Sequence, residues 1–363
     1  MTRLEQDIEG VVAAYQDPYL GTTLGAAKVV KSLSIDGGRV QIDVDLGFPA
    51  AGYRDALAAA LRQLVLEVEG VTKAEIRVEG NVLSHAVQRN LKPIPNVKNI
   101  IAVASGKGGV GKSTTAVNLA LALAAEGAAT GILDADIYGP SQPRMLGLQG
   151  SQPDTLDGKR LEPLEAHGVQ AMSIGFLIDE EQPMVWRGPM VTQALNQLIG
   201  ETNWGELDYL IVDMPPGTGD IQLTLSQRVP VSGAIIVTTP QDIALLDARK
   251  GLKMFEKVQV QVLGVVENMS THICSQCGHE EAIFGSGGGR ALAQQYEVPF
   301  LGSLPLDMAI REQVDGGTPS VIADPTGSIA GAYREIARHA AARLAQTAKD
   351  YSHLFPKVSI EES

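Results

Sequence analysis

A glycine-rich stretch with two lysines carries the clearest chemistry in the chain. It consists of Gly106, Lys107, Gly108, Gly109, Val110, Gly111, Lys112, Ser113 and Thr114. The stretch matches G-x-x-x-x-G-K-[ST], between an apolar run at 99–104 and a helical pattern at 113–126. Glycines let backbone amides turn inward around phosphate oxygens, and the helix start adds its positive dipole end. We therefore expect a phosphate loop in which Lys112 reaches the β and γ phosphates of ATP and Ser113 binds Mg²⁺.

Carboxylates follow two other apolar runs. The run at 129–133 leads into Asp134 and Asp136, and the run at 208–212 ends in Asp213. A carboxylate at the carboxyl end of a parallel strand lies on the ligand side of the sheet. Four apolar residues followed by an aspartate are the Walker B pattern, in which the aspartate bonds to the Mg²⁺ sphere. This indicates that Asp213 completes the nucleotide site.

Cys274 and Cys277 are the two cysteines of the chain, and their C-x-x-C spacing lets both thiolates converge on one metal atom. Soft sulfur ligands favour iron–sulfur clusters or zinc, and such sites normally take four ligands. The flanking His272 and His279 would make an intrachain zinc site. A redox disulfide and two plain surface cysteines are further alternatives. Two chains related by a two-fold axis would instead supply four cysteines.

The elements that position these residues form a repeating pattern from residue 99 onward. Mostly continuous apolar runs lie at 99–104, 129–133, 169–174, 208–212, 233–238 and 262–266. Helical patterns lie at 113–126, 189–200, 241–257 and 286–296, and an Ala-rich helix follows residue 327. Continuous runs suit parallel strands that are covered on both faces. The pattern predicts an α/β fold with a mostly parallel sheet and helices on both faces.

A smaller unit with a different pattern precedes this sheet. A helix at 2–16, strands at 27–35 and 39–46, a helix at 53–68 and a strand at 71–78 give the order α-β-β-α-β. Prolines and asparagines then interrupt the periodicity up to residue 98. We expect an accessory domain at 1–80, a linker at 81–97, a nucleotide domain at 98–347 and a tail at 348–363.

Composition excludes several classes of protein. The chain has 363 residues and a formal net charge of −13, which opposes sequence-independent nucleic-acid binding. No apolar run approaches the ~18–20 residues of a membrane helix, and the first residues lack the pattern of a secretory signal. We expect a cytoplasmic protein that binds neither nucleic acid nor membrane.

Lys107 narrows the class of phosphate loop. The pattern K-G-G-x-G-K-[ST] resembles the deviant Walker A loop of the partition and division-site ATPases, the nitrogenase iron protein and the iron–sulfur cluster carriers. In those families the extra lysine crosses a dimer interface to the partner's nucleotide. The resemblance implies an ATP-linked homodimer in which Lys107 stabilises charge on the transferred phosphoryl group.

Several segments in a fixed order resemble the Mrp/ApbC-type iron–sulfur cluster carrier ATPases over roughly 95–345. They are the phosphate loop, L-D-A-D-I-Y-G-P-S (133–141), W-R-G-P-M (186–190), D-M-P-P-G-T-G-D (213–220), E-N-M (267–269) and the C-x-x-C pair. The N-terminal unit resembles the iron–sulfur assembly domain that is often fused to them, although its loop at 47–52 has no cysteine.

This resemblance implies a slow ATPase that binds a [4Fe–4S] cluster between two chains and passes it from scaffold proteins to apo client proteins. It makes Lys107, Lys112 and Asp136 catalytic, with Asp136 orienting the attacking water and helping to hold Mg²⁺. It also assigns Asn268 to the adenine edge.

Three other functions stay open from the sequence. A positioning or partition-type ATPase would act on DNA or membrane, and a zinc-bridged dimeric ATPase would use the same cysteines. An electron-transfer ATPase of the nitrogenase iron protein type would use separated cysteines instead of a C-x-x-C pair.

Overall fold

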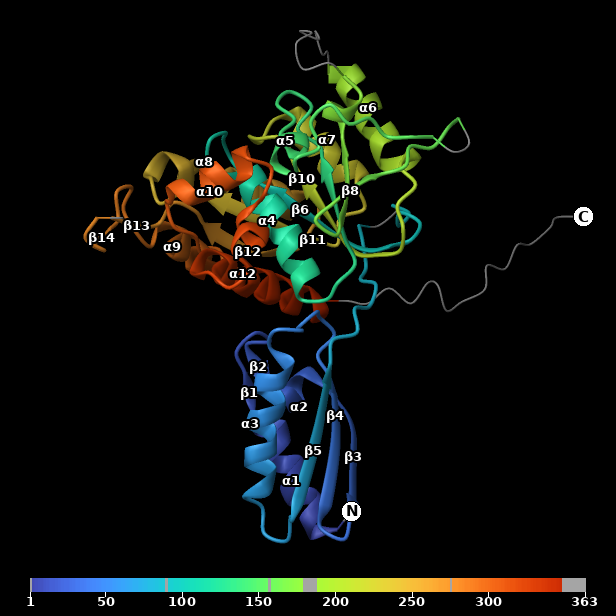
Figure 1. Ribbon diagram of the computed structural model, residues 1–363, viewed down its shortest axis with the longest axis vertical. Coiled ribbons are helices and arrows are strands. Elements are labelled where there is room, and N and C mark those ends of the chain that lie inside the picture. Colours follow the sequence, from blue (N-terminus) through green and yellow to red (C-terminus); the bar gives the residue numbers. More distant parts are fainter. Residues whose placement is uncertain (1, 89–90, 156–157, 179–187, 275, 348–363) are drawn as a thin grey trace, which may run out of the picture.

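The computed structural model describes residues 2–88, 91–155, 158–178, 188–274 and 276–347. It contains a small N-terminal body and a larger body built on an eight-stranded sheet (Figure 1). Trp186, Arg187 and the expected tail at 348–363 lie outside the described residues. No helix in these ranges combines the length and apolar character needed to cross a bilayer.

The small body has the predicted order of long elements. They are α1 (Arg3–Ala14), β3 (Val30–Asp36), β4 (Arg39–Asp45), α3 (Arg54–Leu66) and β5 (Lys73–Glu79). Strand β4 pairs antiparallel with β3 and parallel with β5. Val40, Ile42 and Val44 alternate with exposed residues along β4, so one face of this sheet packs on the helices.

Short elements near residue 20 were not predicted. Strands β1 (Gln16–Asp17) and β2 (Thr22–Thr23) pair, and α2 (Leu24–Ala27) follows them. The side chain of Thr23 caps α2, and Lys28 ends it in a left-handed conformation with φ of 55°. The strand expected from residue 27 therefore begins at Val30.

The sheet of the large body has the order β15-β12-β11-β6-β10-β7-β9-β8, and among these described strands only β8 runs antiparallel to its neighbour. Six of its strands lie at the predicted apolar runs. They are β6 (Val97–Ala104), β7 (Thr130–Asp134), β9 (Val169–Ser173), β10 (Leu207–Asp213), β11 (Gly233–Thr238) and β12 (Val262–Glu267). Two short edge strands, β8 (Leu164–Ala166) and β15 (Phe300–Ser303), were not predicted.

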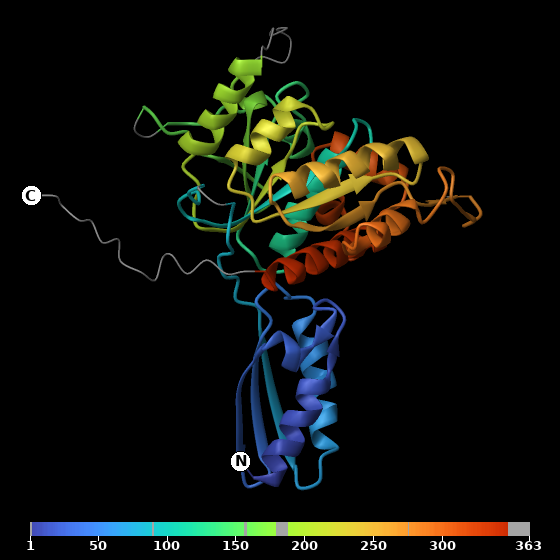
Figure 2. The ribbon, with the colours of Figure 1, turned by 180° about the vertical axis from the view of Figure 1, so that it is seen from behind.

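Helices cover both faces of this sheet, as expected (Figures 1 and 2). On one face, α4 (Lys112–Ala125) contacts α5 (Gln142–Met145), α11 (Ser320–Ala323) and α12 (Ser328–Ala345), while α10 (Met308–Asp315) contacts α5 and α11. The other face carries α6 (Gly188–Glu201), α7 (Asp220–Arg228), α8 (Asp242–Lys257) and α9 (Gly288–Gln295). This division follows from right-handed crossovers between parallel strands.

The two bodies meet at the carboxyl end of α4, where Glu126 caps that helix. The Glu126 carboxylate is fully buried and accepts hydrogen bonds from Arg334 at 2.7 Å, Arg338 at 2.6 Å and the Gly52 amide at 2.9 Å. Arg338 also donates to the Tyr19 hydroxyl at 2.9 Å. Residues of the small body thus share one buried ionic cluster with α4 and α12.

Candidate functional site

The phosphate loop connects β6 to α4 and depends on glycine at three positions. Gly109 and Gly111 both have φ of 81°, and Gly111 caps the start of α4. At Gly106, an added Cβ would lie 2.1 Å from the carbonyl carbon of Asp247 in α8. The loop therefore lies directly against α8.

The structure brings the predicted lysine and carboxylates of the nucleotide site together. Lys112, only 6 % exposed, forms an ion pair with Asp213, and its Nζ lies 3.9 Å from Oδ2 of Asp136. The same Nζ lies 3.1 Å from Oγ of Ser113. Since β6, β7 and β10 are adjacent in the sheet, their carboxyl ends deliver the loop and both carboxylates to one place.

Asp134 braces the segment that carries Asp136. Its carboxylate accepts bonds from the amides of Asp136, Ser141 and Gln142 at 2.9–3.1 Å and from the Ser173 hydroxyl at 3.1 Å. Burial and the nearby Asp213 charge raise the pKa of Asp134 to about 7. Burial also raises the pKa of Asp136, although Lys112 acts in the opposite direction. Asp134 is thus a structural anchor, while Asp136 faces Lys112.

Gln142 is a site residue that the motifs did not reveal. Its Nε2 donates to Oδ2 of Asp213 at 2.9 Å and to the Ser113 carbonyl at 3.2 Å. The side chain is fully buried, and its Oε1 has no hydrogen-bond partner in the described part of the chain. A buried oxygen without a donor costs about 1–3 kcal/mol, so this atom fits a site that supplies a donor, such as metal-bound water. No spacing rule identified Gln142, because it belongs to the first turn of a four-residue helix.

Asn268 lies against the phosphate loop. Its Nδ2 donates to the Val110 carbonyl at 2.9 Å, and its Oδ1 accepts from the Met269 amide at 2.9 Å. The contact joins the end of β12 to the loop. Adenine recognition by Asn268 stays a prediction, and so do the roles expected of the other site residues.

The cysteines lie in a hairpin that follows Asn268. Strands β13 (His272–Ile273) and β14 (Glu280–Glu281) pair, and the Cys274 amide donates to the His279 carbonyl at 2.9 Å. Cys277 is exposed and Cys274 is half-exposed. Hydrogen bonds from the backbone amides of Gln276 and Cys277 lower the pKa of Cys274, which favours the thiolate that binds metals.

In the described part of the chain, the neighbouring histidines are not grouped with the cysteines in a metal site. Nδ1 of His272 lies 2.9 Å from the Leu306 carbonyl, so this ring nitrogen is occupied. Among the described residues, no group of three or more His, Cys, Asp or Glu side chains is placed to hold a metal ion. The chain therefore offers two cysteine sulfurs, one exposed and one partly exposed.

Comparisons with known proteins agree with this geometry. Residues 96–341 match a family described as "NUBPL iron-transfer P-loop NTPase", and residues 5–78 match one described as "Iron-sulfur cluster assembly protein". The "Iron-sulfur cluster carrier protein" of Pseudomonas fragi is 61 % identical, and the match covers 76 % of this chain and 97 % of that protein. The protein of the same name in Escherichia coli K12 is 49 % identical, and the match covers 93 % of this chain and 91 % of that protein. The mouse "Iron-sulfur cluster transfer protein NUBPL" is 54 % identical over 70 % of this chain and 80 % of its own.

Solved structures agree on the fold. A nucleotide-binding protein from Archaeoglobus fulgidus in complex with ADP has a TM-score of 0.54 and 38 % identity, covering 61 % of this chain and 87 % of its own. The Pyrococcus furiosus cell division ATPase MinD has a TM-score of 0.51 and 24 % identity, covering 66 % and 97 %, which shows the fold alone. The predicted P-loop α/β fold and the family resemblance are confirmed.

Proposed function

The chain belongs to the NUBPL-type iron-transfer P-loop NTPases, and we propose that it carries [4Fe–4S] clusters to apo client proteins under the control of ATP. The proposal rests on one segment of the chain, which contacts the phosphate loop and then continues into the cysteine hairpin. Asn268 contacts the phosphate loop, and the Cys274–Cys277 hairpin follows it directly. A change in the loop thus has a short route to the cysteines.

The proposal divides the chain into an accessory domain at 1–80, a linker at 81–97, an ATPase domain at 98–347 and a tail at 348–363. The end of β5 at Glu79 and the start of β6 at Val97 support the linker. Two free cysteines suit a reducing compartment, which supports a cytoplasmic location.

ATP and Mg²⁺ fit the residues around the phosphate loop. Lys112 would leave Asp213 for the phosphates, which compete for its charge, and Ser113, Asp213 and Asp136, which all lie near its Nζ, would hold Mg²⁺. Mg²⁺ would neutralise charge on the phosphate oxygens. Gln142 would keep Asp213 in place once Lys112 has moved, because it holds the other carboxylate oxygen. Hydrolysis of ATP at this site is part of the proposal.

Lys107 supports a dimer. Its backbone carbonyl accepts a bond from the Ser105 hydroxyl at 2.9 Å, which fixes the loop, and its side chain is half-exposed. Within the described ranges, Lys107 has no ion-pair partner. In a two-fold dimer its charge would reach the nucleotide of the other chain.

The cluster, as cargo, would be held between two chains. Each chain supplies only Cys274 and Cys277, and a [4Fe–4S] cluster normally takes four thiolates. Large exposed apolar side chains gather on α8 and around the hairpin, a surface that suits burial by a second copy. They are Ile243, Leu246, Ile273, Ile283 and Phe284.

A transfer assay tests this function. Protein reconstituted anaerobically with iron and sulfide is mixed with an apo-enzyme that needs a [4Fe–4S] cluster, with and without ATP and Mg²⁺. We expect activation that Cys274→Ala abolishes and that Lys112→Ala makes independent of ATP. Activation by wild-type protein that is no greater than activation by Cys274→Ala protein or by free iron and sulfide would refute the carrier function.

A further inference from the structure

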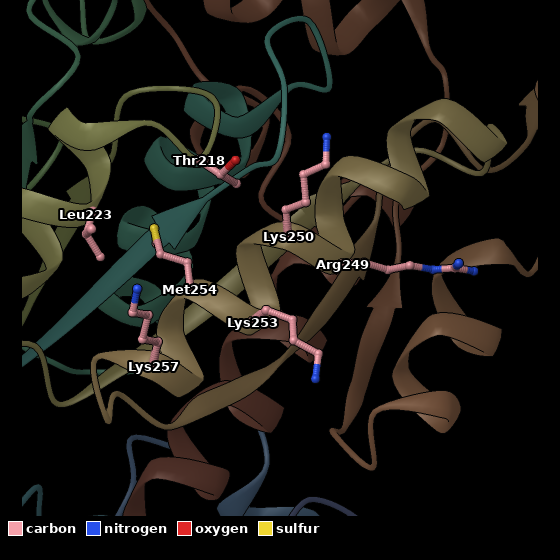
Figure 3. Close-up of a pocket in the computed structure, with 7 residues that line it drawn as sticks. All are labelled: Thr218, Leu223, Arg249, Lys250, Lys253, Met254 and Lys257. Carbon is pink, nitrogen blue, oxygen red and sulfur yellow. The ribbon is translucent and has the colours of Figure 1, made fainter.

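An open cavity of about 460 Å³ lies on the surface between α7 and α8, and its lining does not include the carboxylates of the nucleotide site (Figure 3). Leu223 and Met254 contribute an apolar surface, and Thr218 lines the side that belongs to the loop after Asp213. The remaining lining residues are four cations of α8, namely Arg249, Lys250, Lys253 and Lys257. We call this cavity the α8 groove.

The cations of the α8 groove are held by weak contacts, and Nζ of Lys253 also lies 5.7 Å from the centre of the Tyr296 ring. Lys250 pairs with Asp247 at 2.8 Å and Lys253 with Glu256 at 3.6 Å, but both lysines are about two-thirds exposed, so these pairs are weak. In the described part of the chain, Arg249 and Lys257 have no ionic partner. The groove is thus locally basic on a chain whose net charge is −13.

Both sides of the groove are attached to the phosphate loop. The Gly217 amide, next to Thr218, donates to the Ser105 carbonyl at 3.0 Å. On the α8 side, Asp247 packs so closely on Gly106 that an added Cβ would come within 2.1 Å of it. Because residues 105 and 106 begin the phosphate loop, these two contacts give a rearrangement of that loop a direct route to both sides of the groove.

The arrangement of the cations indicates the kind of ligand. In Figure 3 their charged ends spread along α8 and do not meet at one point, which does not suit a single small anion. Residues 249–257 span about 12 Å of helix, the length of about four residues of extended chain. A nucleic acid would extend past this patch and bring its phosphates against an acidic protein.

We propose that the α8 groove binds a short acidic segment of a partner protein, with carboxylates against the four cations and an apolar side chain on Leu223 and Met254. The nucleotide at the phosphate loop sets the affinity of this contact. Only this second part rests on the proposed nucleotide function, and neither part requires a bound cluster.

Fluorescence anisotropy with a labelled peptide of four Glu-Glu-Leu repeats tests the groove. The full chain without cluster is titrated at low and at physiological salt, with Mg²⁺ and either ADP or a non-hydrolysable ATP analogue. We compare wild type with Lys253→Glu/Lys257→Glu. The matched control Lys31→Glu/Lys73→Glu changes the net charge equally on the small body, and thermal melting checks that all variants fold.

The groove variant is expected to weaken peptide binding at least tenfold, with the control within twofold of wild type, because two attractive contacts become repulsive. The two nucleotides should give affinities that differ at least threefold. Equal weakening in both variants, or tight binding of a labelled 20-nucleotide DNA with none of the peptide, would overturn the groove proposal. Equal affinity with both nucleotides would overturn the coupling to the loop.

Discussion

The two lysines of the phosphate loop have different surroundings, so substituting each by alanine should have a different effect. Lys112 is buried among carboxylates that phosphates must displace, while Lys107 is half-exposed. Lys107→Ala should leave ATP affinity within about threefold but lower hydrolysis at least ~100-fold, as loss of a charge supplied from a partner subunit does. Lys112→Ala should lose binding itself.

Equilibrium binding of a fluorescent ATP analogue and phosphate release measure the two effects separately. Lys73→Ala is the control, because that lysine lies on the small body. If Lys107→Ala weakened nucleotide binding as much as Lys112→Ala, both lysines would serve the same chain's nucleotide.

Gln142 should matter only when Mg²⁺ is present. Gln142→Met removes the donor to Asp213 with little change in volume. We expect ATP affinity to fall about 5–30-fold with Mg²⁺, about 1–2 kcal/mol, and to stay unchanged in EDTA. Isothermal titration calorimetry in both buffers measures this difference. An equal loss in EDTA would mean that Gln142 supports the loop and not the metal.

At this scale the motifs identified the lysine and the carboxylates of the site, but not Gln142 and not all of the contacts. Motif spacing brought Lys112, Asp136 and Asp213 together, because parallel strands end at a common edge. The anchoring bonds of Asp134 and the contacts of Gln142 depend on how residues 137–142 turn back toward the sheet. No local pattern encodes that turn.

Helix α4 has a functional group at each end, with Lys112 at its start and Glu126 as its carboxyl cap. Glu126→Gln removes the charge that faces Arg334 and Arg338, which should lower the free energy of unfolding by about 3 kcal/mol. The control Glu335→Gln removes an exposed partner of the same Arg338 and should cost under ~1 kcal/mol. Denaturant unfolding measures both losses of unfolding free energy. Equal small losses would show that the buried ion pairs of Glu126 do not stabilise the fold.

The same contact predicts a pH dependence. Burial would raise the pKa of Glu126, but hydrogen bonds from Arg338, Gly52 and Arg334 outweigh it and lower that pKa from 4.5. A carboxyl with a lowered folded-state pKa stabilises the fold fully above 4.5, and this is lost as the pH falls through the folded-state value. The melting-temperature gap between wild type and Glu126→Gln should therefore be constant above pH 4.5 and shrink below it. Calorimetry from pH 3 to pH 7 measures this gap. A gap that widened as the pH fell would contradict a lowered pKa of Glu126 in the folded state.

Among the elements, the long apolar strands could be predicted from the sequence and the short edge strands could not. Strands such as β6 and β10 are buried on both faces, so their sequences are continuously apolar. Strand β8 has three residues, none of them fully buried, and β15 contains Gly302, so neither has a recognisable pattern. Their pairing depends on neighbours that are distant in sequence.

At the scale of the whole molecule, the net charge of the chain does not reveal where its charged side chains lie. A charge of −13 argues against nucleic-acid binding but conceals the basic α8 groove, since composition has no spatial resolution. The cysteine count likewise states two ligands without stating where the other two come from. In the proposed function a second copy of the chain would supply them, and the exposed Cys277 suits that role.

The most direct test measures iron, sulfide and mass on the same sample. Protein reconstituted anaerobically is analysed for iron and acid-labile sulfide per chain and by native mass spectrometry, with Cys277→Ser as the control. We predict a dimer with about two iron ions per chain, because four thiolates from two chains hold one four-iron cluster. A monomer with about four iron ions per chain, or a dimer with one zinc per two chains and no sulfide, would contradict the account.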